Sequence, residues 1–322
     1  IDSGSGTYNH RRGDIVEVAS VPLGNNEWSV PRNIVFRNAK IEGSLRVYGL
    51  GKNGEAARVK ASSYNESHVE YVRKNAPSDI TLESLDIKGY GRTPVYFSPG
   101  VTEVTLRQSR IHGESIRVGI YLDAESGRNS ITNNIISVTT QDGSMFGFYD
   151  RGWPQIAIDG SQSNVIEGNQ FYRLQQGGIY VYRNCGEGGT VRHSKPSNNR
   201  LVDNEFHYTL SSSNPAVANP AIYIGSRDYG LWEKRLPGSH CNDDEQPGVK
   251  IGSAVSNADH ATDTEIRGNR VHLHQTVGMY RMPRGYSLRE RFIVRNPKIN
   301  RGTVTADNAL VVDRTRLSEN YK

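Results

Sequence analysis

The stretch that decides the fold is QIAIDGSQSNVIEGNQFYRLQQGGIYVYRNCGE, residues 155–187. It opens with a short β-prone run, passes through a turn to a second run that carries an asparagine, and ends in a third run. The same order of runs recurs along the chain, so the sequence predicts a repeat protein.

The asparagine-bearing run has the pattern x-x-[IL]-x-[NGD]-Asn-x-apolar. Its copies are NSITNNII (129–136), NVIEGNQF (164–171), NRLVDNEF (199–206) and TEIRGNRV (264–271), with looser copies at 33–41, 79–87 and 103–111. Asparagine tolerates the left-handed backbone of a tight bend, and a buried amide can pair with the same position one coil away. The pattern therefore predicts a ladder of side chains at Asn134, Asn169, Asn204 and Asn269.

The spacing of this position decides between architectures. It is 24 residues from Leu85 to Ser109 and 25 from Ser109 to Asn134. It then grows to 35, 35 and 65 residues along the ladder. A short period with growing insertions predicts a solenoid of short strands whose insertions lie on one face. The Trp/Gly signature of a β-propeller is absent.

This asparagine pattern resembles that of the right-handed parallel β-helix proteins, a group that includes pectate lyases and related carbohydrate-active proteins. The resemblance covers residues 32–300. It implies an all-β, right-handed parallel β-helix and a carbohydrate ligand, without selecting one chemistry. We expect a single domain over 1–322, with 1–31 as an N-terminal cap, 32–300 as coils, and 301–322 as a terminal strand and polar tail.

The composition of the chain limits the kinds of molecule that it is expected to bind. The 322 residues carry a formal charge of +5 without any Lys/Arg run, which favours an acidic polymer other than nucleic acid. No run of ~18 apolar residues occurs, so we expect no membrane insertion. The first residue is Ile1, which suggests the mature form of a secreted or periplasmic protein. Cys185 and Cys241 are either bridged, as in an oxidising compartment, or free.

A second run precedes each asparagine-bearing run, and these runs also align. Alternation in a strand turns residues such as Ile120 and Leu122 to the core and the residue between them outward. The predicted outward column is Arg46, Tyr96, Tyr121, Ala157, Tyr180 and Tyr223. One interpretation is that aromatic side chains simply pack on a sheet. The other is a sugar-binding surface, where rings stack on pyranose faces.

Polar residues follow each of these runs, and stacked coils bring such residues to within ~5 Å of one another. They form a predicted wall of carboxylates, guanidinium groups and tyrosines that suits an acidic polysaccharide. We expect Arg183 and Arg227 to clamp a uronate carboxylate, and Tyr180 and His193 to act as acid and base. Expected substrate contacts are Tyr96, Tyr121, Asp123, Asp159, Asn184, Lys195 and Tyr223. Each of these also has a plain interpretation as a solvated turn residue.

Several chemistries fit this wall. β-Elimination on a uronate polysaccharide is preferred, and C5-epimerisation needs removal of the same proton. Hydrolysis needs two carboxyl groups, for which Asp123 and Asp159 on neighbouring coils are candidates. A non-catalytic role as a polysaccharide binder, adhesin or tailspike uses the same scaffold. Asp123, Glu125 and Asp159 are candidate Ca²⁺ ligands, or else turn carboxylates paired with arginine.

Overall fold

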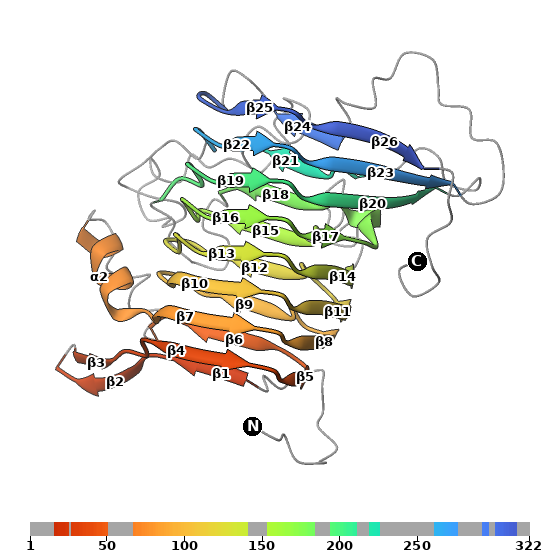
Figure 1. Ribbon diagram of the computed structural model, residues 1–322. Coiled ribbons are helices and arrows are strands. Elements are labelled where there is room, and N and C mark those ends of the chain that lie inside the picture. Colours follow the sequence, from red (N-terminus) through yellow and green to blue (C-terminus); the bar gives the residue numbers. More distant parts are fainter. Residues whose placement is uncertain are drawn as a thin grey trace.

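The computed structural model of the protein describes residues 16–25, 27–50, 67–140, 153–183, 194–210, 219–225, 261–275, 292–295 and 300–313. Short strands in these residues form three long parallel sheets, stacked coil upon coil from one end of the molecule to the other (Figure 1). A separate antiparallel hairpin, sheet B, consists of β2 (Val21–Gly24) and β3 (Glu27–Ser29).

Sheet A carries the predicted outward column. Its strands in spatial order are β1 (Val16–Ala19), β6 (Leu45–Tyr48), β9 (Val95–Phe97), β12 (Ile120–Leu122), β15 (Ile156–Asp159), β18 (Ile179–Tyr182), β21 (Ile222–Ile224) and β24 (Ile293–Arg295).

Sheets C and D share the asparagine-bearing segments, and the turn at the asparagine separates them. Sheet C contains β4 (Ile34–Arg37), β7 (Ser78–Glu83), β10 (Thr102–Arg107), β13 (Ser130–Thr132), β16 (Val165–Glu167), β19 (Arg200–Val202), β22 (Glu265–Arg267) and β25 (Val304–Ala306). Sheet D contains β5 (Lys40–Glu42), β8 (Asp86–Gly91), β11 (Arg110–Ser115), β14 (Ile135–Thr140), β17 (Gln170–Phe171), β20 (Glu205–Leu210), β23 (Arg270–Gln275) and β26 (Ala309–Asp313).

Each coil passes through sheets C, D and A in turn, and each strand pairs in parallel with its equivalent one coil away. In sheet A the register joins Ile120 to Ile156, Ile156 to Ile179, and Ile179 to Ile222. This is the parallel β-helix that the spacing predicts, and the all-β fold class is confirmed.

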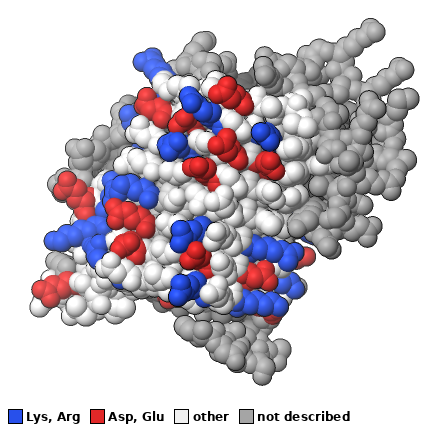
Figure 2. All heavy atoms as spheres, viewed as in Figure 1, with Lys and Arg blue, Asp and Glu red and all other residues white. Residues whose placement is uncertain are grey.

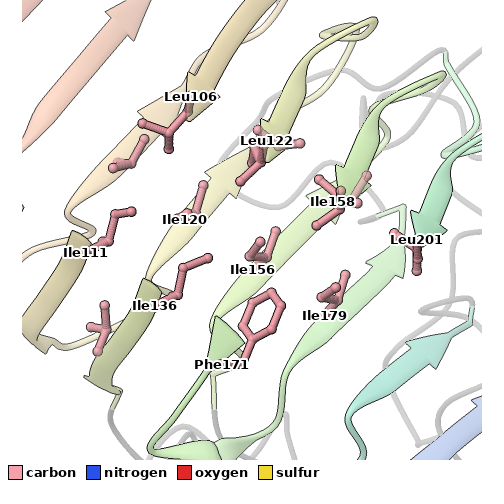
Figure 3. Packing of buried hydrophobic residues seen from close by; sticks show 14 of the residues in the cluster. Leu106, Ile111, Ile120, Leu122, Ile136, Ile156, Ile158, Phe171, Ile179 and Leu201 are labelled. Atoms are coloured by element: carbon pink, nitrogen blue, oxygen red, sulfur yellow. The ribbon is translucent and has the colours of Figure 1, made fainter. Parts of the chain in front are cut away.

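The core fills the space between the three sheets with ladders of aliphatic side chains. Ile120, Leu122, Ile156, Ile158 and Ile179 are fully buried, and they line up from coil to coil in Figure 3. Phe171 and Phe206 stack within this ladder with ring centroids 4.8 Å apart. Burial of each such side chain contributes ~1.5–3 kcal/mol, and no coil gains this without its neighbours.

The predicted asparagine ladder is present and longer than expected. The backbone N–H of Asn134 donates to Oδ1 of Asn169 at 3.0 Å, and Asn169 donates in the same way to Asn204 at 3.1 Å. The series continues through Asn269 to Asn308, and the first member accepts from the backbone of Ser109. A second ladder, which the sequence analysis missed, joins Asn129, Asn164 and Asn199.

The left-handed residue of the bend is not the ladder asparagine itself. It is the residue before it, as at Asn133 (φ 55°), Gly168 (φ 64°) and Asp203 (φ 52°). Two neighbouring positions of the bend therefore favour asparagine for two different reasons. The left-handed position selects Asn, Gly or Asp, and the ladder position selects a buried amide.

The ends of the solenoid differ from its middle. β1 is the terminal strand of sheet A. α2 (Ser67–Asn75) ends just before Pro77, and a 3₁₀ turn, η2, spans Leu174–Gln176. In the described parts of the chain no helix is long and apolar enough to cross a membrane.

Candidate functional site

The predicted outward column of sheet A exists in register. Arg46 pairs with Tyr96, Tyr96 with Tyr121, and Tyr121 with Ala157. Ala157 then pairs with Tyr180, and Tyr180 with Tyr223. We call these six residues the tyrosine column.

The first half of the tyrosine column is partly exposed. Tyr96 and Tyr121 stack with ring centroids 5.8 Å apart and an interplanar angle of 21°. The Arg46 guanidinium lies 5.2 Å from the centre of the Tyr96 ring, a cation–π contact. Tyr48 meets Tyr96 edge-on at 5.9 Å. This half presents aromatic faces beside a positive charge.

The second half of the column is buried. Tyr180 and Tyr223 are each 7 % exposed, and they pack edge to face at 5.5 Å. They belong to an apolar cluster with Val118, Ala157 and Tyr182. The Tyr180 hydroxyl donates to the backbone oxygen of Gln176 at 3.3 Å. Packing is therefore the evident role of this half.

Two tyrosines of the exposed half hold buried carboxylates on the next coil. The Tyr96 hydroxyl donates to Oδ2 of Asp123 at 2.6 Å, and the Tyr121 hydroxyl donates to Oδ2 of Asp159. Asp123 lies two residues after Tyr121 on the same side of its strand, so it sits diagonally across from Tyr96. Asp123 is 5 % exposed and Asp159 is fully buried, and hydrogen bonds replace the water that each carboxylate lost.

Glu125 connects the turn that follows β12 to other segments of the chain. Its Oε2 accepts from the backbone N–H of Ser194 at 3.0 Å. Arg73 of α2 donates to the Glu125 carbonyl at 2.8 Å and to the Ser194 hydroxyl at 3.3 Å. Burial lowers the pKa of Arg73, and the charge of Glu125 opposes that shift. The sequence analysis missed Arg73 and Ser194, since the repeat does not show which segments pack against this turn.

The three predicted Ca²⁺ ligands do not form a tight oxygen cluster. Among the described residues, one group of three metal-ligating side chains has its ligand atoms within 4.8 Å of one another, and it is Glu205, His207 and His272 on sheet D. Calcium binding at Asp123, Glu125 and Asp159 stays a prediction.

Arg183 is fully buried directly after β18. A Cβ placed on Gly160 would lie 3.6 Å from Cγ of Arg183 and 3.6 Å from Cα of Ala124. The arginine stem therefore packs against the turns that follow β12 and β15, beside the Asp159 backbone.

The remaining predicted site residues fall in two classes. Lys195 is exposed, just beyond Ser194. Asn184, His193 and Arg227 lie outside the described residues, as do Cys185 and Cys241, so their roles stay predictions.

Comparison with known proteins adds to this geometry. No curated protein matches the chain. The family model described as "right handed beta helix region" matches residues 29–231, well over half of the sequence. With its three parallel sheets and its asparagine ladders, the chain belongs to the right-handed β-helix family.

Proposed function

We propose that the protein cleaves an acidic, uronate-containing polysaccharide by β-elimination on the outward face of sheet A. The observation that carries the proposal is the pair of tyrosine-to-carboxylate hydrogen bonds on consecutive coils, Tyr96 to Asp123 and Tyr121 to Asp159. They lie directly beside a partly exposed aromatic stack that carries Arg46. Such a polymer meets the enzyme outside the cytoplasm, in keeping with the expected secreted or periplasmic location.

Recognition uses the exposed half of the tyrosine column. The faces of Tyr96 and Tyr121 are suited to stacking on sugar rings. A guanidinium group matches a carboxylate with two parallel hydrogen bonds, and Arg46 is the partly exposed arginine of this column. Arg183 is fully buried, so we assign it to balancing the charge of the buried carboxylates.

In the elimination, a base removes the proton on the carbon next to the uronate carboxyl group. The electron pair forms a carbon–carbon double bond, and the glycosidic oxygen leaves with the electrons of its bond and takes up a proton. Arginine stabilises the negative charge that builds on the carboxyl group. We assign the proton donor to Tyr121, because its hydroxyl is oriented by Asp159 at a partly exposed position. Tyr180 is the less exposed alternative, and His193 is the proposed base.

The direct test is a panel of uronate polysaccharides with ultraviolet absorbance as the readout. Elimination yields an unsaturated, absorbing product. New reducing ends without absorbance would overturn elimination in favour of hydrolysis. Altered uronate stereochemistry by NMR, without chain cleavage, would favour C5-epimerisation. Retention on an immobilised polymer with no product would leave a binding protein.

Replacement of one phenol tests the assigned donor. Tyr121→Phe keeps the ring but removes the hydroxyl, and we expect turnover to fall by about 10²–10⁴-fold with little change in substrate binding. Tyr90→Phe is the matched control, because Tyr90 lies in β8 of sheet D, away from the column. Full activity of Tyr121→Phe would remove this residue from the mechanism.

Hydrolysis is the second candidate, and the two buried carboxylates favour it. Asp123 directly follows β12, and Asp159 is the last residue of β15, which pairs with β12 on the neighbouring coil. Strands in a sheet lie ~4.8 Å apart, close to the ~5–5.5 Å between the carboxyl groups of retaining glycosidases. The Asp159→Asn variant distinguishes hydrolysis from elimination. It should abolish hydrolysis, whereas it leaves an elimination whose proton donor is Tyr121 impaired but measurable.

A further inference from the structure

A cluster of histidines lies on the outward side of sheet D, away from the tyrosine column. His207 in β20 pairs in register with His272 in β23. Their rings stack with centroids 4.6 Å apart, and Tyr172 stacks on His207, also at 4.6 Å. His274 lies two residues after His272 and therefore on the same side of the strand.

The ring of His207 is oriented by contacts at both nitrogens. Its Nδ1 lies 3.0 Å from Nε2 of His274, within hydrogen-bond distance. Its Nε2 lies 3.6 Å from Oε2 of Glu205, two residues earlier in the same strand. One ligand atom each from Glu205, His207 and His272 falls within 4.8 Å of the others.

We propose that Glu205, His207 and His272 bind a divalent transition-metal ion of the Zn²⁺ type. Imidazole nitrogen suits zinc and its neighbours in the first transition row, whereas Ca²⁺ and Mg²⁺ prefer oxygen ligands alone. Two histidines and a carboxylate form a known ligand set that leaves one position open for water or another ligand. This site rests on sheet D alone and is independent of the proposed lyase function.

The residues around the three proposed ligands favour the binding of a metal ion. Metal-bound histidine usually shares its second nitrogen with a hydrogen-bond partner, and His274 supplies that partner for His207. Zinc–nitrogen bonds of ~2.0–2.1 Å in a tetrahedron bring ligand atoms to about 3.3 Å of one another. The Glu205 side chain is 32 % exposed, so it has room to swing inward and close that gap.

Binding here would tie together two coils with a long connection. The ladder positions of these coils, Asn204 and Asn269, are 65 residues apart, the longest separation in the asparagine ladder. An ion held from both β20 and β23 binds the folded chain and not the unfolded one, so it stabilises the fold.

The test uses the full chain, stripped with a chelator and then titrated with Co²⁺ while the visible d–d absorption is followed. We expect one Co²⁺ per chain, displacement by Zn²⁺, and no displacement by a large excess of Ca²⁺. Zn²⁺ should also raise the melting temperature by several degrees. Absence of Co²⁺ binding at micromolar concentration, or equal displacement by Ca²⁺, would overturn the proposal.

Variants on two different strands assign the ligands. His272→Gln and Glu205→Gln should each weaken Co²⁺ binding by about 100-fold or more, and His274→Gln by about 10–100-fold. His112→Gln is the matched control, since His112 lies in β11 of the same sheet and contacts Asp86 instead. Circular dichroism of each metal-free variant verifies its fold. Undiminished Co²⁺ binding by a folded His272→Gln or Glu205→Gln protein would contradict the assignment.

Discussion

At the scale of the residue, the sequence indicates in which direction a side chain points but not how deeply it is buried. Alternation along a strand predicts that Asp123 and Asp159 point away from the core, and they share that side with the tyrosine column. Yet both carboxylates are buried, and each is held by a tyrosine hydroxyl of the preceding coil. The direction of a side chain follows from the local alternation along its strand. Its burial depends on contacts with other segments, which the repeat does not encode.

His112 provides a prediction at this scale. Burial and the nearby charge of Arg110 lower the pKa of His112, and Asp86, at 3.0 Å, opposes them only in part. The folded protein therefore binds this proton less readily than the unfolded chain, whose histidine titrates near 6.5. Stability from this residue is intact above pH 6.5 and declines as the pH falls below that value toward the lowered pKa.

The measurement is the free energy of unfolding by denaturant at several pH values between neutral and mildly acidic. His112→Gln should lose less stability on acidification than the wild-type protein. A steeper loss in the variant would mean that attraction to Asp86 outweighs burial and the cations Arg110 and Lys88.

At the scale of the element, the asparagine ladder is the feature that most restricts the sequence. The buried side chain of Asn134 accepts from the Ser109 backbone at 2.9 Å and donates to the Leu106 carbonyl and to Asn169, each at 3.0 Å. Asn134→Ala leaves these buried groups without their partner, and we expect a loss of about 2–4 kcal/mol in the free energy of unfolding.

The adjacent asparagine is the control for this prediction. Asn133 is exposed and left-handed, and glycine occupies the equivalent place at Gly168 and Gly268. Asn133→Gly should therefore change stability by less than about 0.5 kcal/mol. Denaturant unfolding of both variants decides the matter. Equal losses would contradict the assignment of this stability to the buried amide ladder.

Repetition explains which elements the sequence predicts. In-register positions such as Asn169 or Tyr121 recur at the same place within each short run, so aligning the runs reveals them although the spacing between coils varies. The same alignment places His207 and His272 three residues after their ladder asparagines, a signal that was open to the sequence analysis but not used. Contacts between unlike segments carry no such signal. Arg73 and the Glu125 carbonyl are 52 residues apart and belong to no repeat.

At the scale of the whole molecule, charge is spread rather than gathered on the face seen in Figure 2, where acidic and basic side chains are interspersed. Ion pairs along sheet C and the turns before its strands join neighbouring coils, as between Arg107 and Glu83 at 3.1 Å and between Arg128 and Glu103 at 3.0 Å. Such exposed pairs contribute little stability each. The described residues on this face therefore form no basic patch.

The stacked architecture predicts that stability depends on position along the axis. Each coil packs only on the coils next to it, so an end coil has half the support of a central one. Ile156 is fully buried in a central coil, whereas Leu310 in β26 is only partly buried at the end of sheet D. We expect Ile156→Ala to cost about 2–5 kcal/mol and to speed hydrogen exchange in the coils on both sides. Leu310→Ala should speed exchange in β26 and β23 alone. Hydrogen exchange followed by mass spectrometry measures both patterns, and a uniform increase along the chain in the Leu310→Ala protein would show that the solenoid unfolds as one cooperative unit.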